Sequence, residues 1–92
     1  MVAIHKYPLD IVSQQGIDVS GYMGCLSVKE VRKELVFYIM VDTDPTLQTR
    51  TMQVKIVGTG NNASETKDYR FVGSVAMKDS IRVWHVFIKE PE

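Results

Sequence analysis

The sequence predicts an all-β fold, mainly antiparallel, arranged as a small sandwich or partly open barrel of six or seven strands, with room for one short helical turn. Two observations predict it. From residue 35 onward, apolar and β-branched residues occur in runs separated by turn-forming residues. Within most of these runs, apolar and polar residues alternate with the period of two that turns one face of a strand toward a core.

The first strands are predicted from short segments. Residues 2–7 favour a strand that closes at Tyr7-Pro8, because proline lacks the amide hydrogen that a paired strand needs. Residues 16–19 favour a second, short strand, which would end at Ser20-Gly21.

Residues 26–36 allow two interpretations. Ser27 and Glu30 have the spacing of a helix capping box, with apolar residues following at helical intervals. Against this, Leu26-Ser27-Val28 alternates as a strand does, and a turn at Arg32-Lys33 would pair it with the next segment. We favour the hairpin.

The middle of the chain gives the clearest strands. Residues 35–41 are apolar on both alternating faces, which is typical of a central strand covered on both sides. The run Asp42-Thr43-Asp44-Pro45 is turn chemistry and should end that strand. Residues 49–57 then alternate, and we expect one face to be buried, that of Met52, Val54 and Ile56.

A loop over residues 58–67 should lead into a final hairpin over residues 69–88. On its first strand we expect one face to carry Tyr69, Phe71, Val75 and Met77, with Gly73 marking a bulge or a close approach of another backbone. Lys78-Asp79 is predicted as a two-residue turn into a strand over 81–88. The two faces of that second strand are Ile81/Val83/His85/Phe87 and Trp84/Val86/Ile88.

Composition limits the class of protein. A chain of 92 residues with 45% hydrophobic and 24% charged residues fits one globular domain, residues 1–92. Eleven basic residues balance eleven acidic ones, which argues against a broad nucleic-acid surface.

We find no apolar run long enough to cross a membrane and no signal-peptide pattern, so we expect no membrane association and a cytoplasmic location. The single cysteine, Cys25, agrees with a reducing compartment.

The order and spacing of several short motifs resemble a family of small uncharacterised proteins encoded by bacteriophages and prophages. The resemblance spans almost the whole chain and implies expression inside an infected bacterium, without an activity. In that family Arg32-Lys33 corresponds to turn residues such as Asn-Gly, so the two basic residues here suggest a longer or looser turn. The motifs are Lys6-Tyr7-Pro8-Leu9, Leu26-Ser27-Val28, Val41-Asp42, Thr49-Arg50, Ile56-Val57-Gly58-Thr59-Gly60 and Trp84-His85-Val86-Phe87.

The strongest candidate for ligand binding is the loop Gly58-Thr59-Gly60-Asn61. Glycines after a strand can free backbone N–H groups to hold an anion, but a simple β-turn that needs positive φ explains them better and is the interpretation we favour. Arg50 and Arg82 flank the strands that carry the aromatic residues and are able to hold a carboxylate or phosphate, although we favour a solvated position on an outer face for both. His85 completes the candidate set. For His85 we favour a hydrogen-bonded, partly buried side chain.

Other kinds of site are weaker. We expect no metal site and no cofactor, because the two histidines and Cys25 lack ligand partners at short spacing. We assign no catalytic residue; a Cys25/His85 nucleophilic pair has no orienting motif nearby. The aromatic residues are able to form a platform for bases or for a protein, but core packing is the interpretation we favour; they are Phe37, Tyr38, Tyr69, Phe71, Trp84 and Phe87.

We therefore expect a non-enzymatic, phage-encoded binding protein that contacts a host protein or other host macromolecule, or a small anionic ligand, for example to modulate host defence or another host process. A small hydrolase acting on a nucleotide and a structural component of the virion or its assembly are the alternatives. Because the edge strands of so small a sheet must be covered, a homodimer or higher oligomer is a second expectation.

Overall fold

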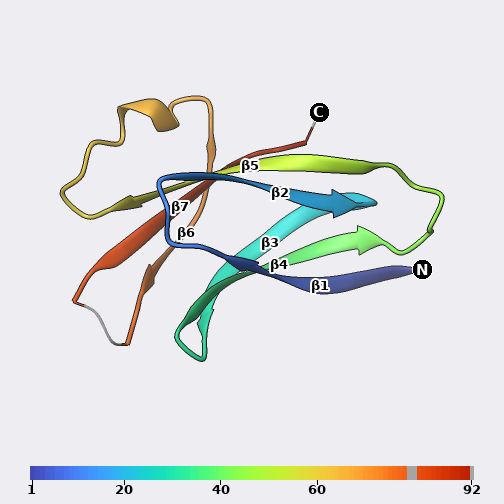
Figure 1. Ribbon diagram of the computed structural model, residues 1–92, viewed down its shortest axis with the longest axis horizontal. Coiled ribbons are helices and arrows are strands. Elements are labelled where there is room, and N and C mark those ends of the chain that lie inside the picture. Colours follow the sequence, from blue (N-terminus) through green and yellow to red (C-terminus); the bar gives the residue numbers. More distant parts are fainter. Residues whose placement is uncertain (79–80, 92) are drawn as a thin grey trace.

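A computed structural model of the chain describes residues 1–78 and 81–91, and nearly all of its regular structure is β (Figure 1). The one helical segment among these residues is a single 3₁₀ turn, η1, at Ser64–Thr66. The strands are β1 (Val2–Leu9), β2 (Gln14–Ser20), β3 (Tyr22–Val31), β4 (Glu34–Asp42), β5 (Thr49–Gly58), β6 (Arg70–Ala76) and β7 (Val83–Lys89). The predicted all-β class and number of strands are confirmed.

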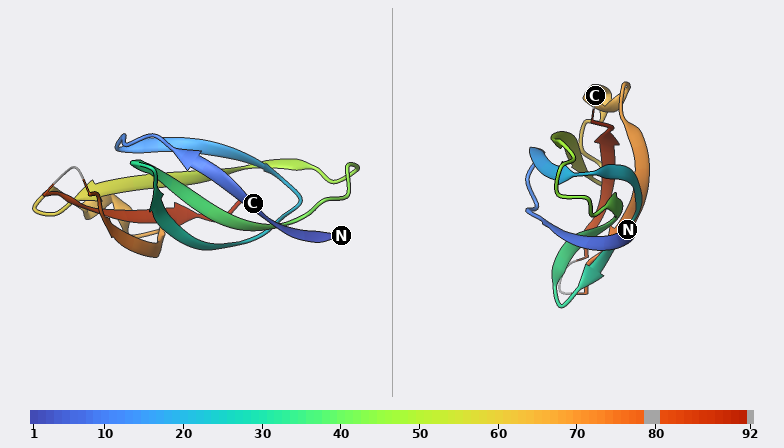
Figure 2. Two further views of the ribbon diagram at one scale, coloured as in Figure 1. Left: turned by 90° about the horizontal axis from the view of Figure 1, so that it is seen from below. Right: turned by 90° about the vertical axis from the view of Figure 1, so that its right-hand side faces the viewer.

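Two antiparallel sheets form the two layers seen edge-on in Figure 2. Sheet A has three strands in the order β1-β4-β3, and sheet B has four in the order β2-β5-β7-β6. The core lies between them, and the central strands of both sheets contribute fully buried side chains, among them Phe37 of β4 and Val86 of β7. The predicted inward face of residues 49–57 is confirmed, because Met52, Val54 and Ile56 are all buried.

The chain passes from sheet B to sheet A at Gly21. This residue separates β2 from β3 and has a φ of 66°. Its N–H donates to the carbonyl of Gln48, just before β5, and its carbonyl accepts from the N–H of Asp42 at the end of β4. One residue is therefore bonded to segments of both sheets, and β2 and β3 behave as one long strand that bends where it changes sheet.

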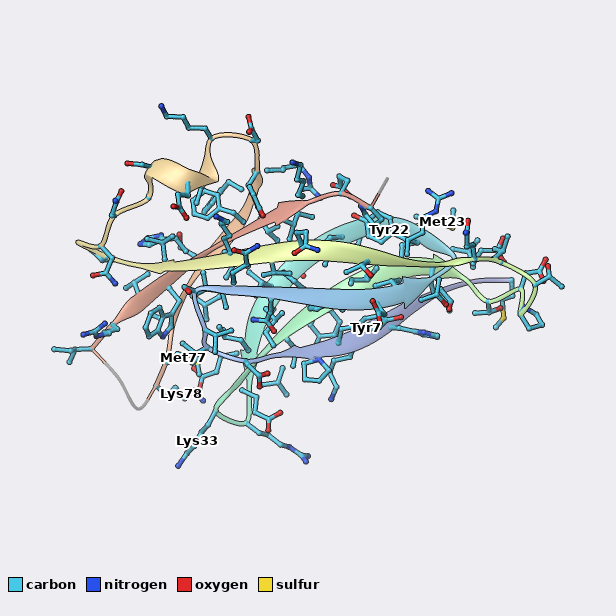
Figure 3. The ribbon with its side chains drawn as sticks, turned by 45° about the horizontal axis from the view of Figure 1, so that its top comes forward. Tyr7, Tyr22, Met23, Lys33, Met77 and Lys78 are labelled. Atoms are coloured by element: carbon cyan, nitrogen blue, oxygen red, sulfur yellow. The ribbon has the colours of Figure 1, made fainter. Side chains whose placement is uncertain are left out.

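The hairpin of β3 and β4 confirms the favoured interpretation of residues 26–36. Its turn is the two residues Arg32 and Lys33, with φ of 52° and 71°. The expectation of a longer or looser turn is wrong, because positive φ at both positions gives the tight type I′ geometry that matches the twist of two paired strands. Figure 3 shows Lys33 at the tip of this hairpin, far from Tyr22 and Met23 at the start of β3.

Three expectations about strand ends are corrected. β1 continues through Pro8 to Leu9 and does not stop at Tyr7, because β1 is an edge strand and proline is tolerated there. β6 ends at Ala76 and β7 begins at Val83, so the connection is longer than the predicted two-residue turn. Residue 79 of that predicted turn lies outside the described residues, and Ile81 is fully exposed, ahead of the strand.

The predicted bulge in β6 is present, but the predicted single face is wrong. The register shifts between Phe71, which pairs with Phe87, and Gly73, which pairs with Val86. The extra residue reverses the alternation, so Val75 and Met77 point into the core, whereas Phe71 lies on the outer face of sheet B.

The edge strands β3 and β6 approach one another and close one side of the sandwich. A Cβ at Gly73 would lie 3.2 Å from Cγ1 of Val28, so glycine permits this approach. Across the same seam, the Glu30 carboxylate accepts from the N–H of Lys78 at 2.9 Å. The opposite edges, β1 and β2, are not paired with one another.

Candidate functional site

The outer face of sheet B collects polar and aromatic side chains from all four strands. The register places Gln14, Lys55, Phe87 and Phe71 in one row across β2, β5, β7 and β6. The neighbouring row holds Val57, His85 and Ser74. We call the combination of Tyr69, Phe71, Phe87, His85, Lys55, Thr59 and Ser74 the sheet B site.

His85 is held at both ring nitrogens. Its Nε2 lies 2.8 Å from Oγ1 of Thr59, and its Nδ1 lies 2.7 Å from Oγ of Ser74. The Thr59 hydroxyl also lies 3.4 Å from the carbonyl of Val83, so the threonine that contacts the ring is itself anchored to the backbone of β7. The expectation of a hydrogen-bonded, partly buried histidine is confirmed.

Ser74 and His85 have the distance of a nucleophile and its base, but the surroundings favour binding. On a sheet face the backbone N–H groups lie in the plane of the sheet and bond to neighbouring strands. A substrate carbonyl placed on Ser74 would therefore meet side chains and no pair of N–H groups to hold a developing oxyanion. The arrangement orients a hydrogen-bonding imidazole more effectively than it supports acyl transfer.

The aromatic part of the site is a pair of phenylalanine rings. The centroids of Phe71 and Phe87 are 5.5 Å apart with the planes tilted at 60°, and Phe71 is 52% exposed. The interpretation of Phe71 as a core residue is therefore wrong, because the β6 bulge turns it outward. An exposed phenylalanine supported by a second ring is a rigid apolar anchor that loses little entropy on binding.

Lys55 borders this pair. Its Nζ lies 3.2 Å from the Glu65 carboxylate and 5.3 Å from the centroid of the Tyr69 ring. The stem of Lys55 is mostly covered, with its side chain 14% exposed, whereas Glu65 is 86% exposed. The 3₁₀ turn that carries Glu65 thus fixes the position of a cation beside the aromatic rings.

The candidate loop is a closed β-turn. The N–H of Asn61 donates to the carbonyl of Gly58 at 3.0 Å, and the N–H of Thr59 donates to Val83 at 3.2 Å. Gly60 has a φ of 90°, and a Cβ at Gly58 would lie 3.1 Å from the Trp84 ring. Turn geometry favours glycine at position 60 and close packing favours it at position 58, which supports the β-turn interpretation over an anion cradle.

Six of the seven candidate residues lie at one end of sheet B, and Arg50 does not. Gly58, Asn61 and Arg82 line a cavity of about 230 Å³. Trp84 forms part of its wall, with the Arg82 guanidinium 5.8 Å from the indole centroid. Arg50 lies at the far end of β5, in a polar cleft of about 450 Å³ that also contains Lys89 and Glu90.

A polar cluster joins the two sheets beside this second cleft. The Arg70 guanidinium donates to Glu90 through Nε at 2.8 Å, and the Tyr22 hydroxyl donates to the same carboxylate. Burial, reinforced by the hydrogen bond to Glu90, raises the pKa of Tyr22 well above its usual value. Burial also raises the pKa of the Cys25 thiol to about 11.

Cys25 points into the core and His85 points outward from the other sheet, so they form no nucleophilic pair.

Sequence reasoning identified Thr59 and His85 but missed Ser74. Ser74 gives no signal in the sequence, because a lone serine in a strand is unremarkable until the register sets it beside a histidine.

Within residues 1–78 and 81–91, no three metal-ligating side chains come together, and no helix is long and apolar enough to span a membrane.

Comparison with known proteins gives one family. A family model described as a domain of unknown function matches residues 1–92, the whole chain. No curated protein and no solved structure matches the chain.

Proposed function

The chain belongs to the family of domains of unknown function DUF7352, and from its geometry we propose that it is a non-enzymatic binding module that docks on a protein through the sheet B site. The observation that carries the proposal is the half-exposed ring of Phe71, supported by Phe87. A small number of residues in an interface supply most of the binding energy, and these residues are commonly aromatic anchors surrounded by polar groups.

The surroundings of the anchor fit a protein partner better than a nucleic acid. Lys55 is already paired with Glu65, and Asp18 accepts from Thr51 at 2.6 Å on the same face. Mixed charges give little of the counterion release that drives binding to phosphates. By contrast, an apolar centre with a rim of hydrogen-bonding side chains has the composition of a protein interface.

The resemblance to phage and prophage proteins supplies a setting for this proposal. In that setting the partner is a host protein in the cytoplasm of an infected bacterium. His85 contributes a fixed hydrogen-bonding group beside the anchor, because Thr59 and Ser74 hold its ring.

The test begins with the immobilised chain and a lysate of bacteria infected by a phage that encodes it. A protein retained by the wild type is then purified, and its affinity is measured by calorimetry. We expect Phe71→Ala to weaken binding by at least about thirtyfold, which corresponds to about 2 kcal/mol for an anchoring residue.

Leu26→Ala is the matched control, because Leu26 is exposed to a similar degree, 49%, on a strand of sheet A. Its affinity should equal that of the wild type. Equal binding by Phe71→Ala, or no protein retained by the wild type, would count against the proposal.

A second candidate ligand is a small anion in the cavity lined by Arg82, Asn61 and Trp84. The guanidinium over the indole ring supports it, since arginine is well suited to hold phosphate or carboxylate. Native mass spectrometry of the same preparation separates the candidates: a bound small molecule that is lost in Arg82→Gln and kept in Phe71→Ala would favour the anion.

A further inference from the structure

The free edge of β1 carries a set of backbone groups whose direction is fixed by one hydrogen bond. The N–H of Thr43 donates to the carbonyl of Met1 at 2.8 Å, which places Met1 among the residues bonded toward β4. In an antiparallel ladder the direction alternates along the strand. The N–H and C=O groups of Val2, Ile4 and Lys6 therefore point away from β4, toward the open edge.

Pro8 has the same parity and confirms the direction. Its missing N–H would also point to the open edge, so the proline costs the β1–β4 ladder no hydrogen bond. Pro8 also limits the length of the edge that is able to pair. A strand that pairs with β1 gains a full hydrogen-bond ladder only over the residues that precede Pro8.

Apolar side chains lie beside this edge on the outer face of sheet A. Val2 is 53% and Ile4 57% exposed. Ile4 shares a row with Met40 and Gly24, and no atom lies within 4 Å of a Cβ built on Gly24. The sequence predicted that β4 is covered on both sides, yet Tyr38 and Met40 are only half-buried in the single chain.

We propose that a second copy of this chain pairs with β1 edge to edge, antiparallel, about a two-fold axis at Ile4. Ile4 then pairs with Ile4 of the second copy, and Val2 with Lys6 of the second copy. All the outward backbone groups of these residues become bonded, and Pro8 lies beyond the ladder. The two three-stranded sheets join into one continuous sheet, in which β3-β4-β1 of the first copy is followed by β1-β4-β3 of the second copy.

Charge complementarity favours a second copy over an unrelated strand. Val2 shares its row with Asp42, whose side chain is 40% exposed and lies 3.8 Å from the N-terminal ammonium of Met1. The two-fold register sets Lys6 of one copy beside Val2 of the other copy. The aliphatic stem of Lys6 then covers that valine, and its ammonium reaches toward Asp42 of the copy that carries the valine. Symmetry makes this contact twice, as an isologous interface requires.

The other edge of sheet A does not offer the same surface, because β3 already faces β6 across the seam. The contact is small, one short strand and its adjoining side chains, whereas a specific interface usually buries at least about 1,000 Å² in total. We therefore expect a reversible dimer. This inference is independent of the sheet B site and does not rest on the proposed function.

Sedimentation across a concentration series tests the dimer, and amide hydrogen exchange followed by NMR tests the interface. We expect a concentration-dependent shift to twice the mass of one chain. The N–H groups of Ile4 and Lys6 should be protected in the dimer and exposed on dilution. Those of Ala3 and His5, which bond to β4, should stay protected throughout.

Four substitutions sharpen the test. Ile4→Pro removes an outward N–H without touching the β1–β4 ladder and should abolish the dimer. Lys6→Glu should weaken it about tenfold, and adding Asp42→Lys should restore it. Lys29→Glu, an exposed site on β3, is the control and should change nothing. A monomer at every concentration, or a dimer that keeps its mass in both Ile4→Pro and Lys6→Glu, would overturn the proposal.

Discussion

At the scale of single residues, the β3–β4 turn carries an avoidable strain. Arg32 and Lys33 both have positive φ, a region in which the Cβ of an L-residue crowds the backbone. Type I′ turns favour Asn-Gly because those residues adopt this conformation at lower cost. The pairing of β3 with β4 holds the two basic residues there.

Replacing Lys33 with glycine should therefore stabilise the protein. We expect the free energy of unfolding to rise by about 0.5–1 kcal/mol, the net of relieved strain and the greater freedom of glycine in the unfolded chain. Chemical denaturation measures this as a shift of the midpoint. Lys29→Gly is the control, because Lys29 lies within β3, where glycine should destabilise by a similar amount. A lower midpoint for Lys33→Gly would contradict the strain argument.

Residues of the sheet B site show what residue type alone reveals. The histidine and the Gly-Thr-Gly motif attract attention because of their chemistry, and the structure joins them through Thr59 and His85. Ser74 and the outward position of Phe71 depend on the register of β6 against β7 and on its bulge. Those features arise from pairing between segments, which residue type does not encode.

At the scale of elements, the passage of the chain from β2 to β3 decides how the sheets are joined. Gly21 has a φ of 66°, and a Cβ built there would lie 2.1 Å from the carbonyl oxygen of Asp42. The approach is between two backbones, so no side-chain rotation relieves it. A glycine is required here for both conformation and space.

Gly21→Ala should cost about 3 kcal/mol or more, because the β2–β3 bend and the end of β4 must separate. Thermal or chemical unfolding measures the loss. Gly24→Ala is the matched control three residues along the chain, since a Cβ there meets no atom within 4 Å. That variant should be as stable as the wild type. Equal stability of the two variants would show that the Gly21 contact is easily relieved.

At the scale of the whole molecule, the two sheets are held together by the apolar core and by the cluster at the β3–β6 seam. Arg70 of sheet B donates through Nη2 to the carbonyl of Cys25 in sheet A at 3.4 Å, and Glu90 binds both Arg70 and Tyr22. Two groups in this seam, the Cys25 thiol and the Tyr22 hydroxyl, keep their protons more firmly in the fold than in the unfolded chain.

Stability should therefore fall at alkaline pH. The Cys25 thiol ionises near pH 9 when unfolded and has a pKa of about 11 when folded, so its contribution is fully present below pH 9 and is lost as the pH rises to about 11. We expect a loss on the order of 1–2 kcal/mol over that interval, measured by denaturation at each pH. Cys25→Ala should flatten the slope between pH 9 and 10. An unchanged slope in that variant would contradict this account.

The two outer faces give the molecule two separate surfaces. Sheet B presents aromatic rings, a fixed histidine and a paired lysine, which support the proposed docking on a protein. Sheet A presents the open β1 edge with its apolar margin. Because these surfaces lie on opposite layers of the sandwich (Figure 2), a dimer through β1 leaves the sheet B site uncovered on each copy.

By itself, the sequence determined the all-β class, the buried face of β5 and the pairing of β3 with β4 as a hairpin, because period-two alternation and the position of a turn are local properties of the chain, whereas the tightness of the turn at Arg32-Lys33 was not foreseen. The tertiary structure alone decided the bend at Gly21, the outward position of Phe71 and the meeting of His85 with Thr59 and Ser74. Each of these depends on register between strands distant in sequence, and a shift of one residue would turn the same side chain to the opposite face.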